Sequence, residues 1–197
     1  MRIQRSAEHR IVPWANGLGV TADVCLWPLD AVEWTWRLSI ADVSHDLPFS
    51  VMPGVDRHIM VANGAGMGLV IDGAAEVRMD RTSPPLSFSG DAVTTCRLLD
   101  GPIADLNLMI RRGVAVGGLR IERLEAGHTV VMSLDDVAAV VLDGSISCGD
   151  EELHQFDALL NGGAFPEPEA SIGITAVRAA VVALASVSRL SSRPSPE

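Results

Sequence analysis

Polar side chains that could hold a small anion recur at alternating positions in two stretches of the sequence. Arg37 and Ser39 alternate with apolar residues in the first stretch, and Asp105, Asn107 and Arg111 do so in the second. Alternate residues of a β-strand point to the same side, so each stretch predicts a strand with a polar face backed by a strongly apolar one. Guanidinium groups pair bidentately with carboxylates, and Ser and Asn add neutral hydrogen bonds. The two stretches therefore predict a pocket for a small polar ligand that carries a carboxylate.

Further candidates lie in loops that lead into the predicted strands, where turn-forming residues crowd together. Trp14 and Asn16 fall in a Pro-Trp-Ala-Asn-Gly-Leu-Gly segment that lacks the Gly-x-Gly-x-x-Gly or Walker pattern of a phosphate loop. Asn16 is expected to hold a turn, and Trp14 to form an apolar wall of the pocket. The complete set of predicted ligand-binding residues is Trp14, Asn16, Arg37, Ser39, Asp42, Ser50, Arg57, Asp105, Asn107 and Arg111.

Three hypotheses fit this set of residues. In the first, a non-enzymatic protein binds the ligand without a metal and acts as a sensor, regulator or buffer, with Asp42 and Asp105 orienting the three arginines. In the second, an isomerase or hydrolase uses Asp42 or Asp105 as its base. In the third, the β surfaces only mediate assembly into a homodimer. The first hypothesis is preferred, because nothing in the sequence identifies a nucleophile together with an activating base.

No metal, cofactor or reactive nucleophile is predicted. The five histidines are dispersed and include no His-x-His pair, which argues against a metal site built from paired histidines. The three cysteines are far apart, without a Cys-x-x-Cys pair, which argues against a zinc ribbon and a disulfide framework. Ser44, His45 and Asp46 are adjacent in the chain and therefore cannot converge as a catalytic triad. A Schiff-base lysine is excluded because the chain contains no lysine.

The composition narrows the classes of partner. The formal net charge is -10, with acidic residues spread along the chain, which argues against a nucleic-acid surface and against binding to anionic membranes. No stretch reaches the roughly 18 apolar residues of a membrane-spanning helix, and the first residues lack the apolar segment of a secretion signal. A cytoplasmic location is expected, with a small polar metabolite as the partner.

Alternation with a period of two recurs along the chain, interrupted by Gly and Pro, and predicts an all-β fold of sandwich or barrel type. The turn signals at Asn63–Gly66 and Asp72–Gly73 predict a three-stranded meander over residues 57–79. A similar Asp-Gly pair follows an apolar stretch at Asp143, which suggests two related β units. Residues 151–160 fit a short helix or a strand with turns, and residues 172–187 fit a closing strand or strand pair.

Ordered motifs between residues 10 and 113 resemble those of the HutD/Ves family. They are Pro13-Trp14-x-Asn16-Gly17-x-Gly19, Trp36-Arg37-x-Ser39-Ile40-Ala41-Asp42, Phe49-Ser50-x-x-Pro53-Gly54-x-Asp56-Arg57, Gly90-Asp91, and Asp105-x-Asn107-x-Met109 with Arg111 to Gly113. The resemblance implies a cupin-like bicupin built from two double-stranded β-helix or jelly-roll barrels. It divides the chain into an N-terminal half at residues 1–113, a C-terminal half at residues 114–188, and a tail at residues 189–197 that is expected to be disordered.

Resemblance to the HutD branch of this family implies a bacterial cytoplasmic protein linked to histidine utilisation. Members are thought to sense or buffer a pathway intermediate, so formylglutamate or a similar carboxylate is the expected ligand. Enzymatic activity is not established for the family. The sequence departs from the usual family residues at four positions near the first motif. Ala15 stands where Lys is frequent, Leu18 where Gly is usual, Val20 where Thr is usual, and Ala22 where Arg is usual.

Overall fold

The computed structural model describes residues 1–14, 19–29, 33–161 and 171–190. In these ranges the chain is built from strands, with a single 3-10 turn, η1 (Ser6–Glu8), as the helical element. The all-β class predicted from the alternating pattern is confirmed. No helix of the described part is long and apolar enough to cross a membrane. The predicted site residue Asn16 and residues 191–197 of the predicted tail lie outside the described ranges.

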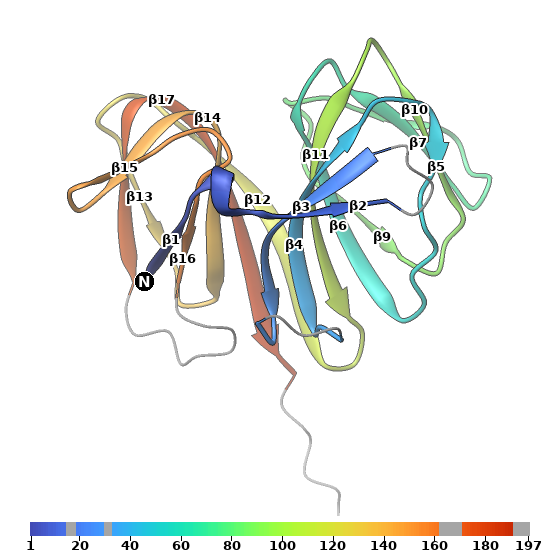
Figure 1. The fold of residues 1–197 in the computed structure, drawn as a ribbon, viewed down its shortest axis with the longest axis horizontal. Coiled ribbons are helices and arrows are strands. Elements are labelled where there is room, and N and C mark those ends of the chain that lie inside the picture. Colours follow the sequence, from blue (N-terminus) through green and yellow to red (C-terminus); the bar gives the residue numbers. More distant parts are fainter. Residues whose placement is uncertain (15–18, 30–32, 162–170, 191–197) are drawn as a thin grey trace, which may run out of the picture.

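Two β units lie side by side, and the first packs a six-stranded sheet against a four-stranded one (Figure 1). The larger sheet has the strand order β2 (Arg10–Pro13), β3 (Gly19–Trp27), β4 (Trp36–Val43), β11 (Ile103–Arg111), β6 (Val55–Asn63) and β9 (Leu86–Ser89). The smaller sheet has the order β5 (Leu47–Pro48), β10 (Thr94–Leu98), β7 (Met67–Ile71) and β8 (Val77–Met79). One face of the larger sheet therefore borders the space between the two sheets.

The second unit is built on one seven-stranded sheet. Its strand order is β1 (Arg2–Gln4), β16 (Ala158–Leu160), β14 (Asp136–Cys148), β17 (Ile172–Arg189) and β12 (Ala115–Leu124), with β13 (Thr129–Met132) paired to β17 and β15 (Glu151–Leu153) paired to β14. The first strand of the chain thus joins the sheet of the second unit. Residues 151–160 form two strands joined by a turn, and the predicted closing element is the single long strand β17.

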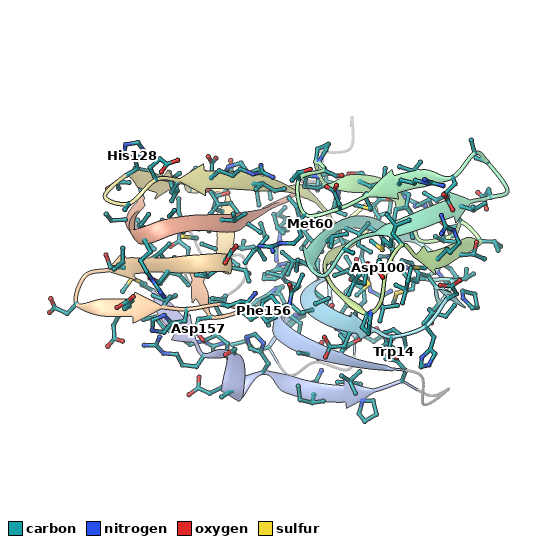
Figure 2. All side chains as sticks on the ribbon, turned by 90° about the horizontal axis from the view of Figure 1, so that it is seen from above. Trp14, Met60, Asp100, His128, Phe156 and Asp157 are labelled. Atoms are coloured by element: carbon teal, nitrogen blue, oxygen red, sulfur yellow. The ribbon has the colours of Figure 1, made fainter. Side chains whose placement is uncertain are left out.

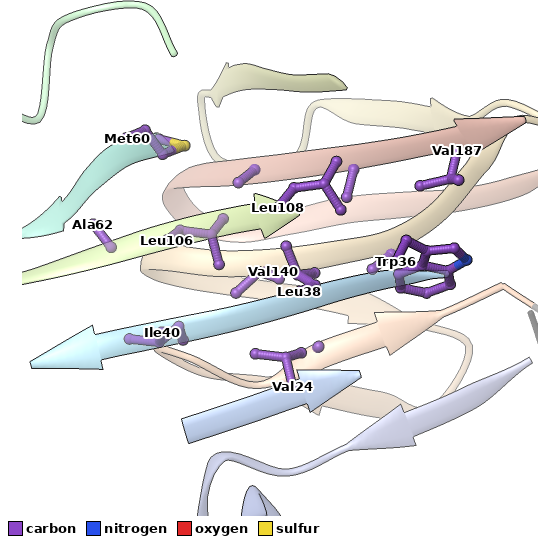
Figure 3. Close-up of a cluster of buried hydrophobic side chains, with 14 of the residues drawn as sticks. Val24, Trp36, Leu38, Ile40, Met60, Ala62, Leu106, Leu108, Val140 and Val187 are labelled. Carbon is purple, nitrogen blue, oxygen red and sulfur yellow. The ribbon is translucent and has the colours of Figure 1, made fainter. Parts of the chain in front are cut away.

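The apolar faces of β4 and β11 pack against the second unit, not inside the first. Trp36, Leu38, Leu106 and Leu108 are at most 1% exposed and belong to a cluster that also holds Val140 of β14 (Figure 3). Side chains of both units contribute to this cluster, so hydrophobic burial joins the units into one body. Met60 of β6 and Phe156 of the β15–β16 turn mark where the units meet (Figure 2).

The opposite faces of β4 and β11 turn into the space between the two sheets of the first unit. One part of this space is filled by an apolar cluster in which Val43, Ile59 and Val61 of the larger sheet meet Met67 and Leu69 of the smaller one. In the remaining part, the positions of β4 and β11 that face inward carry the polar residues noted in the sequence. The fold therefore places the predicted binding face inside the first unit.

One local prediction is wrong and a second is only partly met. The segment Asn63–Gly66 does not close a hairpin, because β6 pairs with β9 and β11 whereas β7 pairs with β8 and β10. The predicted meander is therefore reduced to the β7–β8 hairpin, in which Asp72 and Gly73 adopt positive φ angles of 49° and 71°. The Asp-Gly pair at Asp143 makes no such hairpin, since it lies within β14 where the register with β17 shifts.

Candidate functional site

A cavity of about 390 Å³ lies in the first unit, a volume that suits a small metabolite. Seven of the ten predicted residues line it: Trp14, Arg37, Ser39, Ser50, Arg57, Asp105 and Asn107. The remaining lining residues lie outside that set of ten and are Thr21, Ala41, Leu47, Pro48, Phe49, Met52 and Met109. The structure thus brings most of the predicted polar set to one cavity.

Strand register explains why these side chains meet. Ser39 of β4 lies directly opposite Asn107 of β11, and the neighbouring row joins Arg37, Met109 and Arg57 across three strands. Asp105 lies one row further along β11, opposite Ala41. Because residues two apart on a strand share a face, these rows stack on the same side of the sheet.

Arg57 is a buried cation for which the described residues provide no hydrogen-bond or ion-pair partner. Its residue is 7% exposed, and the guanidinium carbon lies 4.9 Å from the ring centre of Phe49 and 5.2 Å from that of Phe88. Nε forms no hydrogen bond, and no ion pair of the described residues reaches the guanidinium. Burial lowers the pKa of Arg57, and the nearby charge of Asp105 acts in the opposite direction. The two rings hold the cation in a cation–π sandwich at the cavity wall.

Asp105 and Asn107 bring buried acceptors to the same cavity. They are 2% and 4% exposed, and the Oδ1 atom of each has no hydrogen-bond partner among the described residues. Burial raises the pKa of Asp105 to about 7, with Arg57 lowering it and Asp42 raising it further. Asp105 therefore exchanges its proton near neutral pH, which makes it the strongest acid–base candidate of the site.

Arg37 is held by a carboxylate that the sequence reasoning missed. Arg37 Nε donates to Asp23 Oδ1 at 2.6 Å, and its Nη2 pairs with the same oxygen. Arg10 donates to Asp23 Oδ2 through Nε and Nη2, at 3.0 and 2.7 Å. The predicted roles of Asp42 and Asp105 in orienting this arginine are therefore replaced by Asp23, which is buried in β3 opposite Ser39.

Trp14 forms a wall of the cavity, and the first motif explains how it is held. Its indole Nε1 donates to Thr21 Oγ1 at 2.8 Å, and its backbone N–H donates to the carbonyl of Gly19 at 3.0 Å. A Cβ atom on Gly19 would lie 2.8 Å from the Trp14 ring and 2.7 Å from the Asp42 carbonyl oxygen. Only glycine therefore lets the indole ring pack this closely against β3.

Two predicted residues do not line the cavity. Asp42 is exposed and lies directly after Ala41, which faces the cavity, so that its own side chain leaves the opposite face of β4. Arg111 is on the same face of β11 as Asn107 and Met109, but it lies at the exposed end of the strand. There its Nε donates to the Trp34 carbonyl at 2.8 Å, and its guanidinium lies 5.7 Å from the Trp34 ring centre.

Other residues of the motifs tie loops together beside the cavity. Asp91 accepts hydrogen bonds from Ser89 Oγ at 2.8 Å, from the Gly54 N–H at 3.0 Å and from Arg112 Nη1 at 2.9 Å, and these lower the pKa of Asp91 to about 2. Arg112 Nη2 also contacts Asp56 at 2.8 Å. These motif residues tie the loop before β6 to the turns after β9 and β11, and they do not line the cavity.

The cysteines lack the environment of a nucleophile. Burial raises the pKa of Cys96 to about 12 and that of Cys25 to about 11, so both thiols stay protonated at neutral pH. Among the described residues, no group of three or more His, Cys, Asp or Glu side chains is placed to hold a metal ion.

Comparison with known proteins identifies the family. A sequence model named HutD matches residues 6–175. The chain belongs to the HutD family. Its relatives include an uncharacterized 21.2 kDa protein in the hutC 3′ region of Pseudomonas putida and Protein Ves of Citrobacter koseri, each 34% identical, over 116 and 109 residues. Each match covers 55% of this chain, and 57% and 56% of the two relatives, so the chain matches little more than half of their length.

Two solved structures share the fold over nearly the whole length of the chain. A conserved protein of unknown function from Pseudomonas aeruginosa PAO1 has a TM-score of 0.80 at 29% identity, over 94% of this chain and 97% of that one. HutD from Pseudomonas fluorescens SBW25, solved in a formate condition, has a TM-score of 0.79 at 27% identity, over 96% and 98% of the two chains. A cupin 2 barrel protein from Leptotrichia buccalis is similar at the level of the fold, with a TM-score of 0.52, and the predicted cupin-like class is confirmed.

Proposed function

We propose that the protein binds a small carboxylate-bearing metabolite in the cavity of its first unit and acts as a sensor or buffer of that metabolite. The observation that carries this proposal is the buried guanidinium of Arg57 at the cavity wall, for which the described residues provide no hydrogen-bond or ion-pair partner. Leaving a buried charge unpaired is costly, whereas a bidentate carboxylate would satisfy its donors in a site shielded from water.

The other charges of the cavity support an anionic ligand. The charge of Arg37 is shared with Asp23, which is itself bound by Arg10, so this cluster keeps a net positive charge. Asp105 is partly protonated at neutral pH because burial raises its pKa to about 7. The lining therefore offers more positive than negative charge, and it offers the hydroxyl of Ser39 as a neutral partner.

A thermal-shift screen tests the proposal. The P. putida relative carries a hutC-region name, so the probes are formylglutamate and other intermediates of histidine degradation, with glutarate and formate as simple carboxylates. A ligand at 100 times its Kd stabilises the folded state by about 2.7 kcal/mol, which raises the melting temperature measurably. The shift should vanish in Arg57→Gln and persist in Arg111→Gln, a matched loss of charge outside the cavity. Absence of any shift at millimolar concentrations would refute carboxylate binding.

One observation favours a second candidate, an enzyme that uses Asp105 as base. Its raised pKa and its place in the cavity suit proton transfer, whereas Asp42 lies outside. Incubating the bound metabolite with the protein in D2O and following its carbon-bound protons by NMR distinguishes the candidates. Exchange or conversion that is lost in Asp105→Asn would establish catalysis, and an unchanged spectrum would support binding alone.

A further inference from the structure

The unpartnered buried atoms of the first unit are concentrated at the cavity. Six buried side-chain nitrogen or oxygen atoms of the described residues lack a hydrogen-bond partner. Three of them belong to residues that line the cavity: Arg57 Nε, Asp105 Oδ1 and Asn107 Oδ1. Because native proteins leave few buried polar atoms unpaired, such a concentration points to a ligand that completes the hydrogen bonds.

The chemistry of these atoms is not uniform. Arg57 offers donors alone, which a carboxylate satisfies. Asn107 Oδ1 is an acceptor, as is Asp105 Oδ1 while that carboxyl is ionised, and an ionised carboxylate ligand has no donor to give them. A ligand that carried a carboxylate and nothing else would therefore leave two buried acceptors unsatisfied, at a cost of about 1–3 kcal/mol for each.

We infer that the ligand of this cavity is a small carboxylate that also carries an N–H or O–H donor, with the carboxylate on Arg57 and the donor on Asn107 and Asp105. The inference rests on the proposed carboxylate-binding function and narrows its ligand class. Arg57 lies in the cross-strand row of Met109, one row from Asn107. Adjacent rows on one face are about 7 Å apart along the strand, so the donor lies within a few bonds of the carboxylate.

Three small carboxylates provide the test by calorimetric titration of the whole protein. N-acetylglycine carries an N–H donor beside its carboxylate. N-acetylsarcosine replaces that N–H by N-methyl, and N-propionylglycine adds one carbon while keeping the N–H. We expect N-acetylglycine to bind about tenfold or more tightly than N-acetylsarcosine, since a site built for a donor rejects the analogue that lacks it. N-propionylglycine should stay within about threefold of N-acetylglycine, which separates the lost donor from the added size.

Asn107→Leu assigns the preference to its acceptor. Leucine has a similar volume and no polar atom, so the variant should lose most of the preference for the N–H compound. We expect the ratio of the N-acetylglycine affinity to the N-acetylsarcosine affinity to fall to one third of its wild-type value or below. Equal binding of all three compounds to the wild type would overturn the inference, by showing that ordered water satisfies the acceptors, while carboxylate binding would stand. Equal losses for N-acetylsarcosine and N-propionylglycine would overturn it too, by showing a limit of size. If none of the three binds, the proposed function fails and the inference fails with it.

Discussion

Replacing Asp105 by Asn should change how the stability of the protein depends on pH. The pKa of Asp105 is raised from an ordinary 3.8 to about 7, chiefly because the carboxyl is buried in the cavity wall. Between these two values the folded state keeps its proton while the unfolded state has lost it. Stability contributed by this group is therefore fully present below about pH 4, and is lost as the pH rises to 7.

The magnitude follows from the size of the shift. One pKa unit corresponds to about 1.4 kcal/mol, so the wild type should lose roughly 3–4 kcal/mol relative to Asp105→Asn between pH 4 and pH 8. Above about pH 8 the difference should stay constant. Other carboxyl groups titrate in both proteins and cancel in this comparison. Any fixed cost of placing an amide beside Arg57 is the same at each pH and cancels as well.

Urea denaturation of the two proteins at half-unit steps from pH 4 to pH 8 measures the difference directly. Asp42→Asn is the matched control, because this carboxylate is exposed on the neighbouring strand and its removal relieves no comparable desolvation. Between pH 4 and pH 7, the free energy of unfolding of Asp105→Asn minus that of the wild type should increase by about 1.4 kcal/mol for each pH unit. A difference that changes by less than about 1 kcal/mol over the whole range would refute the assigned environment of Asp105.

Three further substitutions test the elements that support the site. Asp23→Asn breaks the buried pair with Arg37 and should lower the free energy of unfolding by about 3 kcal/mol in urea, and a loss below about 0.5 kcal/mol would contradict the bridging role. Gly19→Ala forces the Trp14 ring or the backbone of β4 to move and should cost about 1–3 kcal/mol, so an unchanged melting temperature would disprove the close packing. Leu106→Ala empties part of the core that both units share, and should cost about 2–5 kcal/mol in one cooperative transition, whereas two separate transitions in calorimetry would show that the units unfold independently.

The period of two in the sequence was enough to predict the binding face. Arg37 and Ser39 share a parity on one strand, and Asp105 and Asn107 share a parity on the other, and the structure brings all four to one cavity. The same rule already places Asp42 and Arg37 on opposite faces of the strand. Side chains share a face when their positions differ by an even number, and these two positions differ by five. Asp42 was chosen as a site residue because it belongs to the same sequence motif as Arg37 and Ser39, although the alternation places it on the other face.

Residues contributed by other strands could not be predicted in this way. Phe88 reaches Arg57 because β9 pairs with β6, and Phe49 comes from a loop after β5. No local pattern of the chain specifies such pairings between distant strands. Asp23 was within reach of the alternation rule, since it shares a face with Thr21, but β3 has a register shift directly after it that ends the simple pattern.

Turn chemistry predicted where the chain reverses but not which strands pair. Asn63–Gly66 carries a hairpin signal, yet it joins strands of two different sheets. The departures at Val20 and Ala22 also gain a structural meaning, because neither residue lines the cavity while Thr21 between them does. The loss of an arginine at position 22 therefore leaves the described lining of the cavity unchanged.

Titration calorimetry of N-acetylglycine against the wild type, Arg57→Gln and Arg111→Gln tests most directly whether Arg57 anchors a carboxylate. Hydrogen bonds to a charged group are worth about 1.5–3 kcal/mol, so Arg57→Gln should weaken binding by roughly 10- to 150-fold. Arg111→Gln should bind within about twofold of the wild type, because its guanidinium lies outside the cavity. Equal weakening by both substitutions, or undiminished binding to Arg57→Gln, would contradict the account.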